Sequence, residues 1–232
     1  MIERYSISST REQLSERFTA DVPDHYIPRF NACPTQILPV ITSNSPGGVS
    51  FFYWGETPMW AKNKAPAEKI INTAVENLAD KTILRKTLLK ARCIIPADGF
   101  YAWKKLGKKT AIPYRFVMND KSIFSFPGLW EEYEDNDGNE LHTFTLFTIA
   151  SQGVTKEVHE RMPVIFDKTE ENIWLQKTAS EQELIALLNM QSVKEMNYYP
   201  VSSRIMDSKI DMPSLITPTP PTDQFGNLTL FD

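Results

Sequence analysis

Histidine and cysteine side chains are the first candidates for chemistry in this sequence. The chain has three His and two Cys, and His159 stands next to Glu160. An imidazole beside a carboxylate can serve as a general acid or base, although a lone His is more often a surface or core residue. Cys93 lies in an apolar stretch and is expected to be a small buried hydrophobe. With no C-x2-C or H-x3-H pair, no metal site and no cofactor are expected.

A basic segment is the second candidate. Residues 81–115 contain ten Lys and Arg against one acid, Asp98, so the segment carries +9 in a chain of net charge −4. Residues 131–140 hold six acids and no base. A basic stretch in an acidic protein predicts a surface that faces phosphate groups. The alternative is a solvated helix face and a lysine-rich hairpin tip at Gly107.

Short strands alternating with helices must position these groups. Thr10 with Gln13 three residues later predicts a helix over 10–19. Other helices are expected over 67–91 with a break near Asp80, and over 154–162, 171–176 and 180–190. Strands are expected over 5–8, 37–43, 49–55, 113–118, 122–130, 141–150, 163–166 and 201–205, with turns at 45–48 and 98–99 and a hairpin at 135–138. The pattern predicts one α+β domain, residues 1–210, with a curved, largely antiparallel sheet. The Pro- and Thr-rich residues 211–232 are expected to form an extended or partly disordered tail.

Composition excludes several classes of protein. The 232 residues are 41% hydrophobic and 23% charged, which suits one large folded domain. No apolar run reaches ~18 residues, so no membrane partner is expected. The charged start MIERYSISSTREQ lacks the apolar region of a signal peptide. Two cysteines do not make a disulfide scaffold, and a cytoplasmic location is expected.

Several motifs together resemble the SRAP family (SOS response-associated peptidase, or abasic-site processing proteins). They occur in order over about 200 residues: Arg4-Tyr5-Ser6, Arg29-Phe-Asn-Ala-Cys-Pro-Thr-Gln36, Tyr53-Trp-Gly55, Asn72, Arg92-Cys-Ile-Ile-Pro-Ala-Asp-Gly-Phe-Tyr-Ala-Trp103, Pro127-Gly-Leu-Trp130 and His159-Glu-Arg-Met-Pro-Val164. Each motif alone is weak, but the combination is specific. The resemblance implies a β-barrel-like core flanked by helices and a positively charged groove. It also implies binding of single-stranded DNA at abasic sites and capping of the site as a covalent DNA–protein crosslink.

The family's chemistry starts at a Cys exposed by removal of the initiator Met. The α-amine, with a pKa of ~7.7–8.0, condenses with the abasic-site aldehyde to a Schiff base. The neighbouring thiol then closes on the imine carbon to give a stable thiazolidine. A Glu, a His and an Asn act around that carbon as general acid–base and orienting groups.

This sequence departs from the family at the site itself. Ile2 stands where the family has Cys, and Glu3 where it usually has Gly, so no thiazolidine forms at position 2. Methionine removal favours small second residues, so Met1 is expected to remain. Ala102 replaces the catalytic Glu, and Ala74 replaces an Arg expected to meet phosphate. Relaxed catalytic function and engineered substitution both explain this combination.

The resemblance carries the remaining site residues over one by one. His159 and Asn72 are similar to catalytic positions, with Ile2 and Ala102 in the altered catalytic slots. The DNA-binding candidates are Arg4, Asn31, Pro34, Trp54, Trp60, Arg85, Thr148 and Arg161. Arginines at such positions contact phosphate without reading sequence, and Trp54 and Trp60 are either base-stacking platforms or core residues.

The alternative readings of these residues are structural. Asn72 could be a local cap, and Arg161 could form a surface ion pair with Glu157 or Glu160. Trp103 and Trp130 are assigned to the core. Cys33 precedes Pro34 near the pocket that the resemblance implies, but it lacks the adjacent α-amine that thiazolidine chemistry needs.

Three functions follow. The first is binding of single-stranded or junction DNA, with or without abasic sites, without thiazolidine crosslinking. The second is a folded interaction protein whose groove no longer binds DNA. The third is residual catalysis, as an abasic-site lyase through the Met1 amine or as a peptidase. The basic segment with Arg4 and Arg161 favours the first, and the absence of a thiol and a carboxylate at Ile2 and Ala102 counts against the third.

Overall fold

The computed structural model describes residues 2–55, 70–107, 110–134, 138–191, 193–223 and 225–228. Its strands are β1 (Tyr5–Ile7), β2 (Arg29–Ala32), β3 (Ile37–Thr42), β4 (Ser45–Trp54), β5 (Asn72–Ala74), β6 (Arg92–Ala97), β7 (Gly99–Leu106), β8 (Thr110–Met118), β9 (Phe124–Glu134), β10 (Glu140–Ala150), β11 (Arg161–Pro163) and β12 (Met196–Pro200). Its α-helices are α1 (Arg11–Phe18), α2 (Thr82–Lys90), α3 (Lys168–Leu175) and α4 (Glu181–Asn189), and its 3-10 helices are η1 (Val75–Leu78), η2 (Gly153–Glu157), η3 (Ser203–Met206) and η4 (Pro213–Ile216).

Five strands close into a barrel in the order β10-β4-β3-β6-β9, because β9 pairs back onto β10. The short strands β5 and β11 also pair with β10. Within this sheet only the β10–β4 and β10–β5 pairs are parallel, and the others are antiparallel. The predicted α+β fold, with a largely antiparallel, barrel-like core flanked by helices, is confirmed.

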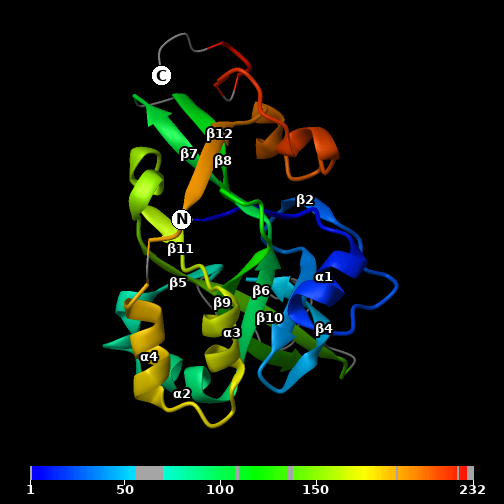
Figure 1. Ribbon diagram of the computed structural model, residues 1–232, viewed down its shortest axis with the longest axis vertical. Coiled ribbons are helices and arrows are strands. Elements are labelled where there is room, and N and C mark those ends of the chain that lie inside the picture. The colour runs from blue at the N-terminus through cyan, green and yellow to red at the C-terminus, as the bar shows by residue number, and fades with distance from the viewer. Residues whose placement is uncertain are drawn as a thin grey trace.

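A second sheet, in the order β12-β8-β7-β1-β2, lies beside the barrel. Figure 1 shows β7, β8 and β12 in the upper half of the molecule, with α2, α3 and α4 beside the barrel in the lower half. The N-terminus lies near the middle of this view, between the two parts. The strand that follows it is therefore placed by both sheets.

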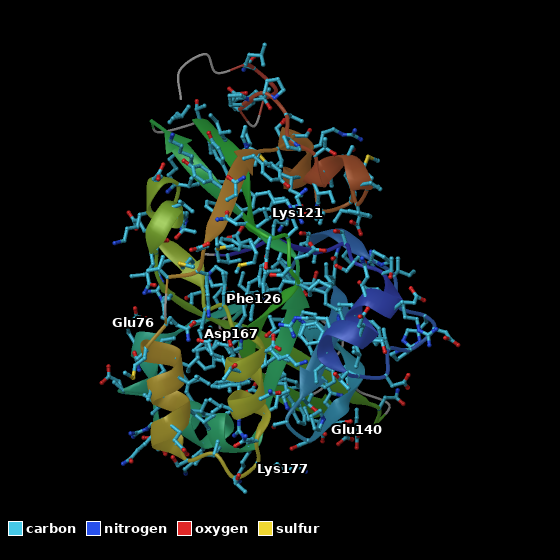
Figure 2. All side chains as sticks on the ribbon, in the orientation of Figure 1. Glu76, Lys121, Phe126, Glu140, Asp167 and Lys177 are labelled. Carbon is cyan, nitrogen blue, oxygen red and sulfur yellow. The ribbon has the colours of Figure 1, made fainter. Side chains whose placement is uncertain are left out.

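Tyr5 joins the two sheets. Its backbone pairs with β2 and β7, while its fully buried ring packs edge-on against Trp54 of β4 at 5.3 Å and Phe126 of β9 at 5.7 Å. Figure 2 shows Phe126 in the interior, whereas Glu140 and Lys177 lie at the periphery. Burial of these three aromatic rings fixes the start of the chain, because each ring removes a large apolar area from water.

The predicted helix over 67–91 is wrong in its described first part. Residues 72–74 form β5, which pairs in parallel with Leu146–Thr148 of β10. Only η1 and α2 are helical, on either side of the predicted break near Asp80. The pairing partner lies some 70 residues away in the chain, so helical spacing within the segment did not reveal it.

Among the other local predictions, some are confirmed and some are wrong. The capping box at Thr10 and Gln13 is present and begins α1. The predicted turn at 45–48 is wrong, because β4 already starts at Ser45, whose N–H donates to Thr42 Oγ1. The segment 154–162 is helical only as far as η2, and 201–205 leads into η3 rather than forming a strand. Cys93 is fully buried, as predicted.

The described part of residues 211–228 differs from a free, extended tail. Pro213–Ile216 form η4, and Leu215 is fully buried in a cluster with Tyr101, Val201 and Ile205. The Asp211 carboxylate accepts hydrogen bonds from the backbone N–H groups of Phe30 and Asn31. Apolar burial and these hydrogen bonds hold the segment on β2 and β7, an attachment that a Pro- and Thr-rich composition does not reveal.

Candidate functional site

The residue in the nucleophile position is built into the fold. Ile2 is fully buried, and its carbonyl accepts a hydrogen bond from Asn72 Nδ2 at 2.7 Å. Asn72 Oδ1 is also buried, and it has no hydrogen-bond partner within the described ranges. Two predicted catalytic positions, 70 residues apart in the chain, therefore meet, and one buried amide oxygen remains open to a donor.

Ala102 lies on β7, beside the N-terminal strand. Phe100 pairs with Tyr5, and the Tyr101 N–H donates to the Arg4 carbonyl at 3.1 Å. The same antiparallel register, continued, brings Ala102 level with Glu3. Ala102 is buried and its methyl group can neither donate nor accept a proton. The position that the family resemblance assigns to a carboxylate is thus occupied by a methyl group.

His159 follows η2 and precedes β11. Its Nδ1 lies 3.0 Å from both the carbonyl oxygen and the amide nitrogen of Arg161, so this backbone orients the ring and leaves Nε2 for proton exchange. Partial burial lowers the pKa of His159, and the positive charges of the N-terminus and Lys105 lower it further. His159 is therefore neutral at pH 7, the form that can accept a proton.

The Arg161 guanidinium donates to a carboxylate and to a residue of β10. Nη1 and Nη2 donate to the two carboxylate oxygens of Glu76 at 2.8 and 3.0 Å. Nη2 also donates to the Thr148 carbonyl and Oγ1 at 2.6 and 3.1 Å. Arg161 forms an ion pair as its structural alternative predicted, but the partner is Glu76 rather than Glu157 or Glu160.

Arg4 is the residue immediately before β1. Its Nη1 donates to the Glu3 carbonyl at 2.8 Å and its Nη2 lies 3.5 Å from the Met206 carbonyl of η3. Its Nε is buried and lacks a partner in the part of the chain that the structure describes. Arg4 thus has donor capacity left for an anion.

Burial corrects the DNA-binding role predicted for Asn31 and Trp54. The fully buried Asn31 donates from Nδ2 to the carbonyls of Asp207 and Ile210, so its donors hold the C-terminal segment. The fully buried Trp54 donates from Nε1 to the Ile71 carbonyl, so it is a core residue and no base can stack on it. The structure contradicts the DNA-contacting role for both side chains.

The other DNA-binding candidates are scattered. Pro34 is partly exposed after β2, and Thr148 is buried under the Arg161 fork. Arg85 of α2 lies 3.8 Å from Glu181 of α4. Trp60 lies outside the described residues. The N-terminal site therefore gathers Ile2, Asn72, Thr148, His159 and Arg161, but not Arg85.

The basic segment is less basic at its surface than its composition suggests. Arg92 is 1% exposed and donates only to main-chain carbonyls, including those of Leu88, Trp174 and Gln176. Arg115 is 6% exposed and pairs with Asp98. Both arginines stabilise the fold, so they do not belong to a phosphate-facing surface.

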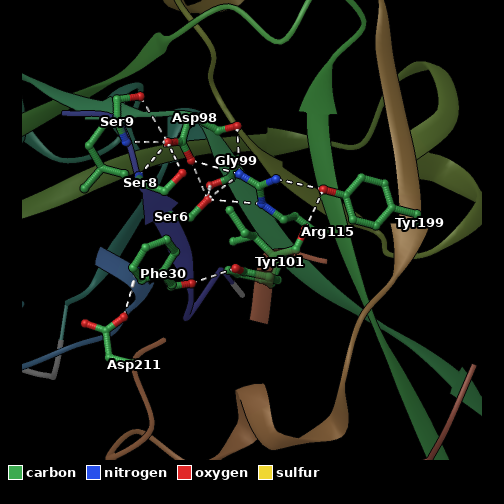
Figure 3. A network of polar contacts seen from close by, with 12 residues as sticks. Ser6, Ser8, Ser9, Phe30, Asp98, Gly99, Tyr101, Arg115, Tyr199 and Asp211 are labelled. Carbon is green, nitrogen blue, oxygen red and sulfur yellow. Dashed lines mark hydrogen bonds and ion pairs between the residues drawn. The ribbon is translucent and has the colours of Figure 1, made fainter. Parts of the chain in front are cut away.

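A network of hydrogen bonds surrounds Asp98 (Figure 3), where the sequence predicted only a turn. Asp98 accepts hydrogen bonds from Ser6, from the amides and hydroxyls of Ser8 and Ser9, and from Arg115 Nη2 at 2.9 Å. The closely spaced serines after β1 were the only signal in the sequence. The network fixes the C-terminal end of β1, five residues after Ile2.

One group of side chains has the composition of a metal site. Ligand atoms of Glu132, Glu140 and His142 all lie within 4.8 Å of one another on the β9–β10 hairpin. Glu132 stands opposite His142 in the register, and their side chains approach to 3.3 Å. This is an exposed cross-strand pair, and we assign no metal to it.

The family model described as SOS response associated peptidase (SRAP) matches residues 1–208. The chain belongs to the SRAP family. The abasic site processing protein YoqW of Bacillus subtilis is 37% identical over 221 residues, covering 93% of this chain and 99% of the relative. The abasic site processing protein HMCES of Rattus norvegicus is 26% identical, covering 84% of this chain and 66% of the relative.

Solved structures share the fold of this chain. A protein from Bacteroides thetaiotaomicron superposes with a TM-score of 0.78 at 24% identity, covering 93% of this chain and 99% of the other. A protein from Bordetella bronchiseptica has a TM-score of 0.72 at 22% identity, covering 86% and 99%. Among the described helices of this SRAP chain, none has the length and apolar character needed to cross a membrane.

Proposed function

We propose that this SRAP chain binds single-stranded DNA, including strands with an abasic site, and does not form a stable crosslink with it. The observation that carries the proposal is the hydrogen bond from Asn72 to the Ile2 carbonyl. It supports an N-terminal site that is assembled as the family requires while its nucleophile position holds an alkyl side chain. The names of the relatives support DNA with an abasic site as the partner.

The chemistry that remains is reversible. A neutral N-terminal amine adds to the abasic-site aldehyde, and loss of water gives an imine. Without a thiol at position 2 no second bond closes on the imine carbon, so water returns the aldehyde and the amine. Ala102 supplies no carboxylate to move the protons, which leaves the neutral His159 as the acid–base group of this site. Any lyase activity would pass through the same imine and would be slow.

Binding is expected to rest on a few phosphate contacts. Arg4 stands immediately before β1 and Arg161 begins β11, and Arg4 has a buried donor without a described partner. Contacts of this kind position a strand without reading its sequence. Affinity for a single-stranded oligomer should fall as salt rises, with a log–log slope of ~−0.7 per phosphate.

A second function is kept because the cations are already paired. Arg161 is bound to Glu76, Arg85 lies near Glu181, and Arg92 and Arg115 are buried. Arginines neutralised or buried in this way suit a folded interaction protein that no longer binds DNA. Fluorescence anisotropy with a labelled single strand at low salt decides, because absence of binding favours the interaction protein.

The test of the chemistry is a denaturing gel and an intact mass after incubation with abasic single-stranded DNA. With borohydride an imine is reduced and an adduct should appear. Without reductant no adduct should survive heating, and the free chain should retain its initiator Met. A heat-stable adduct without borohydride, or a chain that begins at Ile2, would refute the proposal.

A further inference from the structure

We propose that Glu76 gates the site: its carboxylate occupies the phosphate-binding fork of Arg161 and must leave before a DNA phosphate can bind there. This inference rests on the proposed DNA binding and names a residue that regulates it. Glu76 belongs to η1, and sequence analysis assigned it no role.

The Glu76–Arg161 ion pair joins two segments that lie on either side of β10. In the β10 register, Thr148 faces Ala74 of β5 on one side and Pro163 of β11 on the other. Glu76 follows β5 by two residues and Arg161 begins β11. The two side chains therefore meet over Thr148, and Figure 2 shows Glu76 at the edge of the molecule.

The contact uses the face of Arg161 that recognises phosphate. Two nitrogens donate to two carboxylate oxygens at 2.8 and 3.0 Å, which is the bidentate geometry that a phosphate would also take. One fork cannot hold both anions. The hydrogen bond to Glu76 lowers the pKa of that carboxyl group, so the occupant is charged at neutral pH.

The two partners differ in how firmly they are held. The Glu76 side chain is 59% exposed, while that of Arg161 is 29% exposed and also donates to the Thr148 carbonyl and Oγ1. Glu76 can swing into solvent while Arg161 stays in place. The backbone nitrogen of Arg161 lies 3.0 Å from His159 Nδ1, so this residue also contacts the proposed acid–base residue. Opening the gate would free the guanidinium for a phosphate while Thr148 still holds it in place.

The experiment compares Glu76→Gln with the wild-type chain in anisotropy titrations against a labelled single strand over a range of salt. The variant should bind about 2- to 5-fold more tightly at low salt, the gain that corresponds to releasing one exposed ion pair. Its log–log salt slope should match that of the wild type, because the same Arg161–phosphate contact forms in both chains once Glu76 has left. In an Arg161→Gln background the same change at position 76 should give no gain.

Glu160→Gln is the matched control, because it removes the same charge from the exposed residue next to Arg161 without touching the fork. A gain equal to that of Glu76→Gln would show a general effect of charge and overturn the gate. Wild-type binding that is unchanged or weakened by Glu76→Gln would overturn the gate alone. Absence of binding by both wild type and Glu76→Gln would overturn the proposed DNA binding together with the gate.

Discussion

Two arginine–carboxylate pairs lie near the N-terminal strand, and their surroundings differ. The side chains of Asp98 and Arg115 are 10% and 8% exposed, and Asp98 accepts further hydrogen bonds from three serines. The side chains of Glu76 and Arg161 are 59% and 29% exposed, and the carboxylate has a single described partner residue. The first pair is closed and fixes the end of β1, whereas the second is open and can exchange its anion.

The difference separates structural from exchangeable charge within one site. Losing one partner of a buried pair leaves an unpaired charge out of water, which costs about 3–5 kcal/mol. Losing one partner of an exposed pair costs about 0–1 kcal/mol, because water replaces it. The saturated pair and Tyr5 hold β1 in place, while Asn72 Oδ1 and Arg4 Nε, which have no partner among the described residues, belong to residues beside Ile2 and β1.

The largest expected effect comes from restoring the two groups that are absent near the N-terminus, a thiol at position 2 and a carboxylate at position 102. Ile2→Cys should produce some crosslink, because it restores the thiol and favours removal of Met1. Adding Ala102→Glu should raise the crosslinking rate about 10²–10⁴-fold, the range for a positioned acid–base group. Denaturing gels against abasic single-stranded DNA measure both steps.

Ala102→Glu alone is the control and should give no stable crosslink, since Ile2 has no thiol. Ala102 is buried, so each variant is also checked for binding to an intact single strand. A double variant that binds DNA but stays inert would show that Ile2 and Ala102 do not serve one site. If neither the wild-type chain nor the double variant binds, Ala74, in place of the family's Arg, has removed DNA positioning.

The closed pair should dominate stability. Asp98→Ala should lower the free energy of unfolding by about 3–5 kcal/mol, because Arg115 stays buried without its anion. Urea denaturation measures the change, with Glu76→Gln as the matched exposed variant, which should lower it by less than about 1 kcal/mol. Equal losses in the two variants would contradict the distinction between the pairs.

Arg161 should matter for DNA and Lys177 should not. Arg161→Ala should weaken binding to every single-stranded sequence alike and make the salt slope shallower by ~0.7, since one phosphate contact is lost. Lys177 lies at the lower edge of the molecule and Glu76 at its left side (Figure 2), so Lys177→Ala should leave the slope unchanged. The comparison fails if the two variants behave alike.

The smallest effect is a shifted titration at His159. Burial lowers its pKa in the folded chain, so an NMR titration should place its midpoint below ~6.5, the value for an unfolded chain. The unfolded chain then takes up this proton first, and His159 makes the fold less stable as pH falls below ~6.5. Above that pH the penalty is absent. A midpoint at or above ~6.5 would contradict the burial of the ring.

Local features of the fold were predictable because they depend on residues within one turn. The Thr10–Gln13 capping box begins α1, and Ser180 with Glu183 begins α4 where a helix was expected. Segments with long-range pairing were not predictable from their own residues. Asn72–Ala74 forms a strand because β10 offers it a free edge, although the surrounding sequence favours a helix.

The candidate site was likewise only partly predictable from the sequence. The sequence by itself determined which residue types are present: an alkyl group at Ile2, a methyl group at Ala102, and the family's His159 and Arg161. Only the tertiary structure decided their partners, pairing Arg161 with Glu76 across 85 positions and Ser6 with Asp98 across 92. It also buried Trp54 and Asn31, which the motifs had placed on DNA. The physical reason is that motifs specify chemistry at single positions, whereas burial and ion pairing depend on which strands the closed barrel brings together.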